Sequence, residues 1–281
     1  MKLAFPVATP ETADPTMLAL RGELEESFQL LAGLGYQGAE LMVRDPSQLD
    51  PARIRTLASE FELAIPAVST GQMRKEDGLQ LCHPDREARS RAVARTKEVI
   101  DFAAAIESPQ INIGTLRGHL PDSPADSPAD SMERADALAA ARESLEQLLD
   151  YALEKKIGVA LEPQNRFVIN WLNTVEETLD WIAQFGQPNL SILFDAYHAL
   201  FEEASVYAAL IRAFPRISHV QVADSNRLAP GCGQVNFGEL VRVLRALGYR
   251  EYISVEVLPR PSAAEAAAIA ARHLRPLLEE Q

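Results

Sequence analysis

Cysteine and basic residues are both scarce in this chain. Its 281 residues include two cysteines, Cys82 and Cys232, which lie far apart and form no CxxC motif, so the sequence offers no disulfide framework. It has 27 Lys and Arg against 40 Asp and Glu, which gives a formal net charge of −13. Proteins that bind DNA or RNA neutralise phosphates with Lys and Arg. The acidic balance, without a long basic run, therefore predicts no nucleic-acid partner.

The sequence also begins without a targeting or membrane segment. Only a short apolar stretch, Leu3–Pro6, precedes Pro10 and Glu11, which fits neither a signal peptide nor a membrane span. We therefore expect a cytoplasmic protein with no membrane partner. Hydrophobic residues make up 47% and charged residues 24%, the balance of an ordinary soluble globular protein, which excludes disorder as the overall class.

A short apolar run followed by a segment with helical spacing recurs along the whole chain. The predicted strands are Leu3–Ala8, Ala39–Val43, Ala64–Ser69, Gln110–Gly114, Gly158–Leu161, Leu190–Phe194, Ser218–Val222 and Tyr252–Val257. One predicted helix is opened by Asp50 and Pro51, as N-cap and first-turn residue. The others are Leu18–Leu34, Asp85–Ala105, Glu133–Lys155, Thr174–Phe185, Ala204–Phe214, Phe237–Leu247 and Ala263–Leu278.

This alternation predicts a parallel sheet covered by helices. Eight strand–helix units favour closure into a (β/α)₈ TIM barrel, with residues 1–281 as a single domain. The alternative is an open, doubly wound sheet. That fold usually has a glycine-rich phosphate turn after its first strand, whereas here the segment is Ala8-Thr9-Pro10-Glu11.

Residues 121–131 interrupt the rhythm with a short tandem repeat, PDSPADSPADS, that has no large apolar side chain. We expect a flexible surface insertion after strand four, on the active-site face of a barrel. A lid over the site is one interpretation, and a tolerated loop is the one that the general behaviour of loops favours.

Consecutive predicted strands five to eight each bring an oxygen-bearing side chain to the same rim: Glu162, Asp195, Gln221 and Glu256. Three unpaired carboxylates placed together would repel one another and raise their pKa values, and a divalent cation removes that penalty. All-oxygen ligands suit Mn²⁺ or Mg²⁺, with Co²⁺ tolerated. A single acid at a strand end would more simply cap a helix or pair with an Arg. Four consecutive strands favour one bound metal ion, with Mn²⁺ foremost.

Five further residues are candidates for contacting substrate. His219 lies two residues from Gln221 on one strand and so faces the same way, as a supporting or substrate-facing group. His198, in a turn three residues after Asp195, is a donor to a substrate hydroxyl or a partner for a carboxylate. The remaining candidates are Arg227, Arg117 and Glu40. Instead of contacting substrate, each of them could form an ion pair, at the surface or across the barrel.

Several segments resemble the motifs of the xylose-isomerase-like sugar epimerase/isomerase barrels, along the whole chain. They are Glu162-Pro-Gln-Asn165-Arg166, Phe194-Asp195-Ala-Tyr-His198, His219-Val-Gln221-Val-Ala-Asp224-Ser-Asn-Arg227, Pro230-Gly231-Cys-Gly233 and Val255-Glu256. Within that family, the sequence is most similar to 5-keto-L-gluconate epimerase and related ketose 3-epimerases, through segments such as Val43-Arg44-Asp45-Pro46, Thr70-Gly71-Gln72 and Asp77-Gly78-Leu79.

The resemblance implies that Glu162, Asp195, Gln221 and Glu256 bind the metal, and that Glu162 and Glu256 form the acid/base pair. It also places His198 and Arg227 on the substrate. The implied reaction is epimerisation or isomerisation of a keto-sugar or keto-uronate by proton transfer, through an enediolate whose charge the metal stabilises. A homo-oligomer is expected.

The chain departs from the epimerase pattern at two positions. Gln221 stands where these epimerases typically carry His and where hydroxypyruvate isomerases carry Gln, and Val168 stands where the epimerases carry a Glu near the substrate. A hydroxypyruvate-isomerase-like enzyme, an inosose-dehydratase-like enzyme and a non-catalytic sugar-binding protein therefore stay open. An endonuclease IV-like DNA-repair enzyme fits less well, because its metal cluster is rich in His and this chain has five His.

Overall fold

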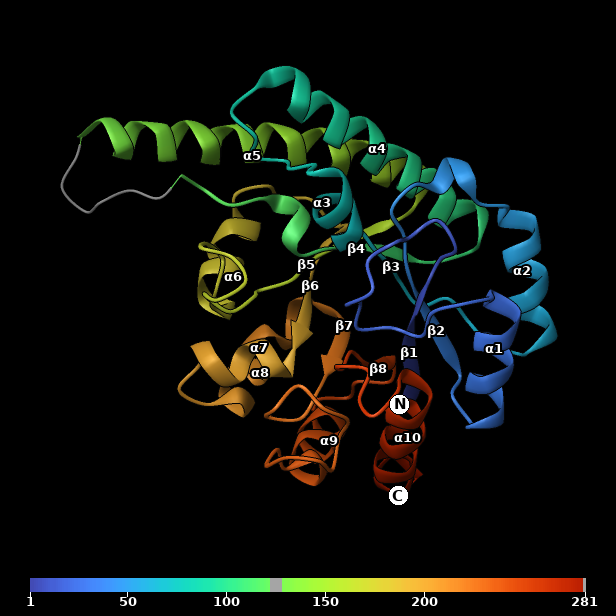
Figure 1. Ribbon diagram of the computed structural model, residues 1–281. Coiled ribbons are helices and arrows are strands. Elements are labelled where there is room, and N and C mark those ends of the chain that lie inside the picture. Colours follow the sequence, from blue (N-terminus) through green and yellow to red (C-terminus); the bar gives the residue numbers. More distant parts are fainter. Residues whose placement is uncertain (122–127, 280–281) are drawn as a thin grey trace.

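Eight parallel strands form a closed barrel in which every strand pairs with its neighbours in sequence order (Figure 1). The computed structural model describes residues 1–121 and 128–279, and only the backbone of residues 128–131. The strands are β1 (Lys2–Ala8), β2 (Gly38–Met42), β3 (Val68–Ser69), β4 (Gln110–Ile113), β5 (Gly158–Leu161), β6 (Leu190–Asp195), β7 (Ile217–Val222) and β8 (Tyr252–Val255). Pairing of Lys2 with Tyr252 joins β1 to β8 and closes the barrel. The predicted (β/α)₈ barrel is confirmed.

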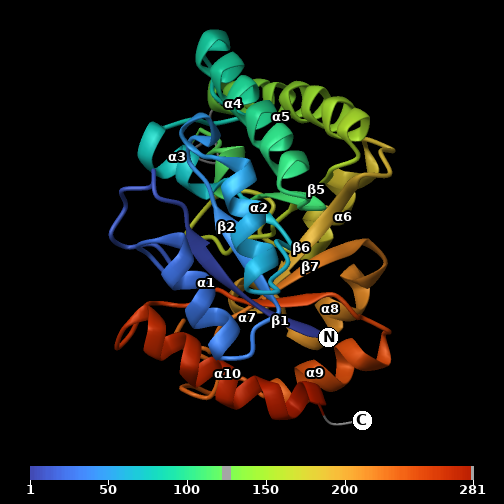
Figure 2. The ribbon, with the colours of Figure 1, turned by 90° about the vertical axis from the view of Figure 1, so that its right-hand side faces the viewer.

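Helices surround the strands (Figure 2). They are α1 (Leu24–Gly33), α2 (Pro51–Glu60), α3 (Gly71–Asp77), α4 (Arg86–Ala105), α5 (Pro128–Lys155), α6 (Val175–Ala183), α7 (Ala196–Glu202), α8 (Val206–Ala213), α9 (Phe237–Ala246) and α10 (Ala263–Glu279). Over the part of the chain that the structure describes, none of these helices is long and apolar enough to cross a bilayer.

Two of the helices begin at capping residues that can be recognised in the sequence. Asp50 accepts hydrogen bonds from the backbone N–H groups of the first turn of α2, with Pro51 as its first residue. Thr174 and Glu177 form a reciprocal capping box at the start of α6. Because these caps satisfy N–H groups that lack a partner within the helix, they fix where each helix leaves the loop above the barrel.

The core is continuous from the strands to the helices. Every residue of β2 and β4 is buried, since parallel strands are covered by helices on one side and by the barrel interior on the other. Phe28 of α1 and Leu244 of α9 are wholly buried against it. Burying side chains of this size stabilises the fold by about 1.5–3 kcal/mol each. This packing holds the strand ends, and with them the site, in fixed positions.

Two local predictions were wrong, and the short helices α3 and α7 were not predicted. Helix α1 begins at Leu24 and not at Leu18, because Leu20 instead hydrogen-bonds to the backbone of Pro6 and Ala8 beside β1. The expected strand Ala64–Ser69 shortens to β3 because Pro66 has no N–H for the sheet. The expected helix Ala204–Phe214 is α8, and a separate helix, α7, precedes it.

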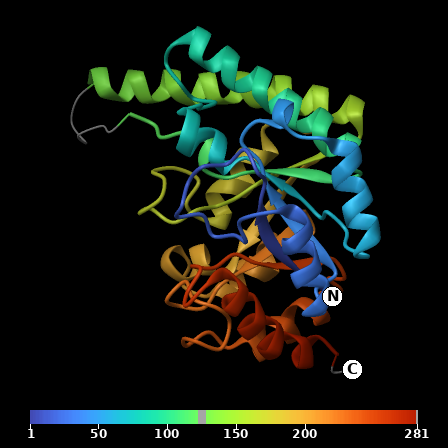
Figure 3. The ribbon, with the colours of Figure 1, turned by 45° about the vertical axis from the view of Figure 1, so that its right-hand side comes forward.

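The predicted insertion at 121–131 lies in part outside the described residues, which exclude 122–127. Residues 128–131 already belong to α5, which therefore begins before the predicted Glu133. Figure 3 shows both termini at one end of the barrel and the loops that follow the strands at the other. The expected flexibility of the insertion stays a prediction.

Candidate active site

A cavity of about 950 Å³ opens at the C-terminal ends of the strands. Its lining includes Ser69, Asn112, Glu162, Gln221 and Glu256, which belong to or directly follow five different strands. A second cavity of about 970 Å³ lies at the N-terminal ends of the strands, where barrels seldom hold catalytic groups. The concentration of carboxylates marks the C-terminal cavity as the candidate active site.

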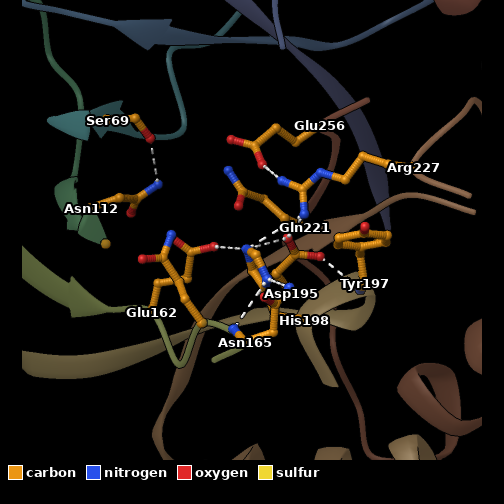
Figure 4. A network of polar contacts seen from close by, with 12 residues as sticks. Ser69, Asn112, Glu162, Asn165, Asp195, Tyr197, His198, Gln221, Arg227 and Glu256 are labelled. Carbon is orange, nitrogen blue, oxygen red and sulfur yellow. Dashed lines mark hydrogen bonds and ion pairs between the residues drawn. The ribbon is translucent and has the colours of Figure 1, made fainter. Parts of the chain in front are cut away.

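Two of the predicted ligands, Glu162 and Asp195, meet the predicted substrate-binding residue His198 at the edge of this cavity (Figure 4). Ligand atoms of Glu162, Asp195 and His198 all lie within 4.8 Å of one another. Asp195 has two functions, because its Oδ1 accepts the Tyr197 N–H at 2.8 Å at the start of α7 while its Oδ2 faces the cluster. The alternative that this acid caps a helix is therefore true of one oxygen, while the other oxygen belongs to the site.

Among the residues that line this cavity, Glu162 and Gln221 each have a buried oxygen, Oε1, that accepts no hydrogen bond in the described structure. A buried acceptor without a partner costs about 1–3 kcal/mol, so native proteins rarely leave one unsatisfied. Two such oxygens beside Asp195 and Glu256 form an oxygen-rich donor set of the kind that Mn²⁺ and Mg²⁺ prefer. The residues present therefore fit a divalent metal ion.

Both candidate acid/base residues hold their protons more tightly than an exposed Glu. Burial, together with the charges of Glu256 and Asp195, raises the pKa of Glu162 well above its usual value. Burial also raises the pKa of Glu256 to about 7, although the charge of Arg227 acts in the opposite direction. A carboxyl with a pKa near 7 can both accept and return a proton at neutral pH.

Arg227 is the cation that contacts the carboxylates of the site. Its guanidinium donates to Asp195 Oδ2 at 3.3 Å, forms an ion pair with Glu256 and lies over the ring of Tyr197 at 4.3 Å (Figure 4). Its backbone φ is +59°, a left-handed conformation that costs a residue other than glycine about 1–2 kcal/mol. The Arg227 side chain thus reaches the carboxylates of the site from a strained backbone conformation.

His198 lies in α7, not in the predicted turn, and its ring is buried. The backbone N–H of Asn165 donates to Nδ1 at 3.3 Å, and the Asn165 side-chain amide lies 2.8 Å from the same nitrogen. Burial lowers the pKa of His198 to about 4, so the ring is neutral at pH 7 and carries its proton on Nε2. Nε2, which is 3.4 Å from Glu162 Oε1, is then a donor and not a metal ligand.

Comparison with known proteins agrees with this geometry. A family model described as "xylose isomerase-like TIM barrel" matches residues 28–277, which is most of the chain. The chain belongs to this family. A curated relative, L-ribulose 3-epimerase of Methylomonas sp. (strain DH-1), is 28% identical over 225 residues, which cover 80% of this chain and 75% of the relative.

Two other relatives of this xylose isomerase-like chain carry a related name. D-psicose 3-epimerase of Enterocloster bolteae is 29% identical over 198 residues, which cover 70% of this chain and 62% of that protein. The crystal structure of D-psicose 3-epimerase with D-tagatose, from Clostridium cellulolyticum H10, superposes with a TM-score of 0.82 at 19% identity, with all of both chains covered. At that identity the superposition establishes the fold.

Glu40 and His219 do not face the cavity of this xylose isomerase-like barrel. Glu40 lies within β2 and is completely buried, and its Oε2 is 3.0 Å from Nε2 of His219. Neither residue lines the C-terminal cavity. Of the two interpretations of Glu40, the one realised is a pair with a basic residue across the barrel. His219 is a supporting group.

Arg117 is also turned away from the cavity, although the sequence places it near the rim. Its guanidinium donates to the backbone carbonyls of Gly114, Glu162, Trp171 and Leu172 at 2.8–3.2 Å. It is 2% exposed and does not line the C-terminal cavity. Arg117 therefore ties the strand-four and strand-five loops together beneath Glu162, and it has no surface ion pair.

Three residues matter to the site that sequence reasoning did not assign to it. Gln164 donates to Glu162 Oε2 at 2.8 Å, and Asn165 orients His198. A Cβ at Gly114 would lie 2.3 Å from Glu162 Oε2, so glycine is required for the carboxylate to occupy its place. The signals for the two amides are their positions two and three residues after Glu162 and their place in the motif Glu162-Pro-Gln-Asn165-Arg166, whereas nothing in the sequence marks Gly114.

Proposed function

We propose that this chain is a divalent-metal-dependent sugar epimerase, an isomerase that moves a proton on the carbon next to a ketone. The observation that carries the proposal is the pair formed by buried Glu162 and half-buried Glu256, whose raised pKa values suit proton transfer beside an oxygen-rich metal site. The names of the curated relatives, L-ribulose 3-epimerase and D-psicose 3-epimerase, support the same class.

The proposed metal ligands are Glu162, Asp195, Gln221 and Glu256, with Mn²⁺ foremost and Mg²⁺ or Co²⁺ as alternatives. When bound, the cation would supply positive charge beside the substrate carbonyl, which acidifies the neighbouring C–H group. His198 is excluded from this set by its Nε2 proton, so it is assigned to the substrate. The unpartnered oxygens of Glu162 and Gln221 are the strongest support for the set.

Glu162 and Glu256 would divide the proton transfer between them. They follow β5 and β8, which β6 and β7 separate, so their carboxyl groups approach the cavity from different sides (Figure 4). One glutamate would remove the proton from one face of the carbon, and the other would return a proton on the opposite face. Gln164, by donating to Oε2 of Glu162, leaves Oε1 as the oxygen that faces the cluster.

His198 and Arg227 would bind the oxygens of the substrate as donors. His198 Nε2–H and the Arg227 guanidinium point into the same cavity, and neutral His198 adds a donor without adding charge. Phe167 and Val168 also line the cavity, so an apolar wall stands where the epimerases have a Glu. We therefore expect a keto-sugar or keto-uronate substrate, whose contacts at this wall differ from those in the epimerases.

A hydroxypyruvate-isomerase-like activity is the second candidate, and it is favoured by Gln221. In that reaction, the proton returns to the neighbouring carbon. A homo-oligomer and a cytoplasmic location stay predictions.

The test is proton exchange in D₂O. Mn²⁺-loaded protein is incubated with a panel of ketoses and keto-uronates, and NMR follows deuterium incorporation and product identity. Deuterium at the carbon next to the carbonyl, with a new epimer, is the expected result. An aldose–ketose product would indicate the isomerase, and loss of water would indicate a dehydratase. No exchange with any panel member would contradict the proposed function.

A further inference from the structure

Glu40 is completely buried in the barrel, where it is the common partner of several polar side chains, among them the proposed metal ligand Gln221. Its Oε1 accepts from Ser69 Oγ at 2.5 Å, from Asn112 Nδ2 at 3.2 Å and from Gln221 Nε2 at 2.8 Å. Its Oε2 lies 3.0 Å from His219 Nε2. One carboxylate on β2 is thereby bound by side chains from β3, β4 and β7.

The cluster decides which way the Gln221 amide points. An amide can present either its oxygen or its NH₂ group to a neighbour, and the neighbour's chemistry selects between them. Oε1 of Glu40 already accepts hydrogen bonds from Ser69 and Asn112, so Gln221 must present its NH₂ group there. The Gln221 oxygen is thereby turned to the other side, where it is buried and has no hydrogen-bond partner.

We propose that Glu40 is a positioning residue that holds the Gln221 carbonyl oxygen toward the metal ion and so sets the metal affinity of this chain. The inference rests on the proposed function, because it takes Gln221 as a metal ligand. A carboxylate that hydrogen-bonds to a ligand's far side fixes the ligand's orientation and strengthens its donor atom. A glutamine ligand needs this more than a carboxylate does, because only one end of an amide can bind a cation.

The strand geometry makes Glu40 a rigid support. His219 and Gln221 are two residues apart on β7, so both side chains face the barrel interior, and each contacts a different oxygen of Glu40. The carboxylate is therefore fixed at both oxygens by the strand that carries the ligand. On the other side of Glu40, Asn112 is itself held by Gln110, whose Nε2 donates to Asn112 Oδ1 at 2.9 Å.

The experiment is a Mn²⁺ titration of metal-depleted protein, followed by the EPR signal of free Mn²⁺, for wild type, Glu40→Gln, Gln221→Ala and the double variant. Glu40→Gln is expected to weaken Mn²⁺ binding by about 10- to 100-fold, the usual effect of losing such a support. In the Gln221→Ala background, the same change is expected to weaken binding less than about twofold, because the ligand that Glu40 positions is already absent.

The controls separate positioning from a loss of folding. Glu40→Asp keeps the carboxylate but withdraws it from Gln221, so it is expected to weaken Mn²⁺ binding as well. Ser144→Ala removes a buried hydrogen bond between α5 and the backbone of Leu81, far from the barrel interior. It is expected to lower the melting temperature of the metal-free protein and to leave Mn²⁺ affinity unchanged.

Two results would overturn the inference, and a third would overturn its basis. Unchanged Mn²⁺ affinity in folded Glu40→Gln would show that Glu40 does not position the ligand. An equal loss in the wild-type and Gln221→Ala backgrounds would show that Glu40 acts only through general stability. Unchanged affinity in Gln221→Ala would instead remove Gln221 from the metal ligands, and the fault would then lie with the proposed function.

Discussion

Two glutamates inside the same barrel have opposite acidities. Glu40 is completely buried, and burial alone would raise its pKa, but His219 and the hydrogen bonds of the cluster lower it to about 2. Glu162 is almost as buried, yet burial and its carboxylate neighbours raise its pKa well above the usual value. The partners of a buried acid, more than its depth, therefore decide whether it is a fixed charge or a proton carrier.

The same contrast separates two layers of the barrel interior, the one around Glu40 and the one that contains the proposed metal ligands. Both oxygens of Glu40 have hydrogen-bond or ion-pair partners, so the layer around Glu40 is stabilised by its own contacts. Oε1 of Glu162 and Oε1 of Gln221 are left without hydrogen-bond partners in the layer above. Satisfied groups rigidify a fold, whereas unsatisfied ones are where a ligand gains binding energy. The predictions below test this division.

The largest effect is expected at the proton carriers. Glu256→Gln removes a proton carrier and a proposed metal ligand together, so the rate of deuterium exchange on a substrate ketose should fall by about 10³-fold or more. Glu251→Gln, an exposed position just before β8, is the matched control and should leave the rate unchanged. Equal rates in wild type and Glu256→Gln would remove Glu256 from the mechanism.

Adding a single methyl group at Gly114 should lower the rate of deuterium exchange almost as strongly. In Gly114→Ala, the new Cβ would lie 2.3 Å from Glu162 Oε2 and 2.7 Å from Gln164 Nε2, so the carboxylate must move. Misplacing a catalytic group by about 1 Å can cost about 10² in rate. The exchange rate measures the loss, with Gly33→Ala, which has open space around its Cβ, as control. A wild-type rate in Gly114→Ala would show that the position of Glu162 is not critical.

Metal binding should weaken as the solution is acidified. Because the pKa of Glu256 is about 7 in the metal-free protein, protons compete with the metal for this carboxylate below that pH. The pKa of Glu162 is raised as well, so the apparent Mn²⁺ affinity should fall by about tenfold or more for each pH unit below 7. Titrations between pH 8 and pH 5.5 measure the slope, which Glu256→Gln should make shallower. A flat profile in the wild type would contradict this.

The smallest effect is expected where the chain departs from the epimerase pattern. Gln221→His replaces one metal-binding side chain by another whose second ring nitrogen can donate to Glu40. Mn²⁺ affinity should therefore stay within about tenfold of the wild-type value. A Mn²⁺ titration measures it beside Gln221→Ala. If His binds no better than Ala, the geometry at this position accepts only an amide.

The sequence was sufficient to predict the barrel and the residues at its rim, because strand ends and carboxylates are local features. Glu162, Asp195, Gln221 and Glu256 each end or directly follow a strand whose apolar run is visible in the sequence. The short helix α7 was not predicted, because its seven residues are too few to show a clear helical spacing of apolar side chains.

The interior contacts were beyond sequence reasoning. Whether Glu40 faces the cavity or the barrel interior depends on the register of β2 against its neighbours. The environment of Arg117 depends on carbonyls more than forty residues away, including that of Trp171. The left-handed backbone of Arg227 depends on how its loop closes on Asp224. The register of β2 and the partners of Arg117 are not encoded in a local pattern.

The most direct test of the account is deuterium exchange at the carbon next to the carbonyl, measured on one ketose with metal-depleted and Mn²⁺-loaded protein. The account predicts exchange and formation of the epimer only with Mn²⁺, and neither in Glu162→Gln or Glu256→Gln. Equal exchange by the metal-depleted protein, or no exchange despite tight binding of one Mn²⁺, would contradict it.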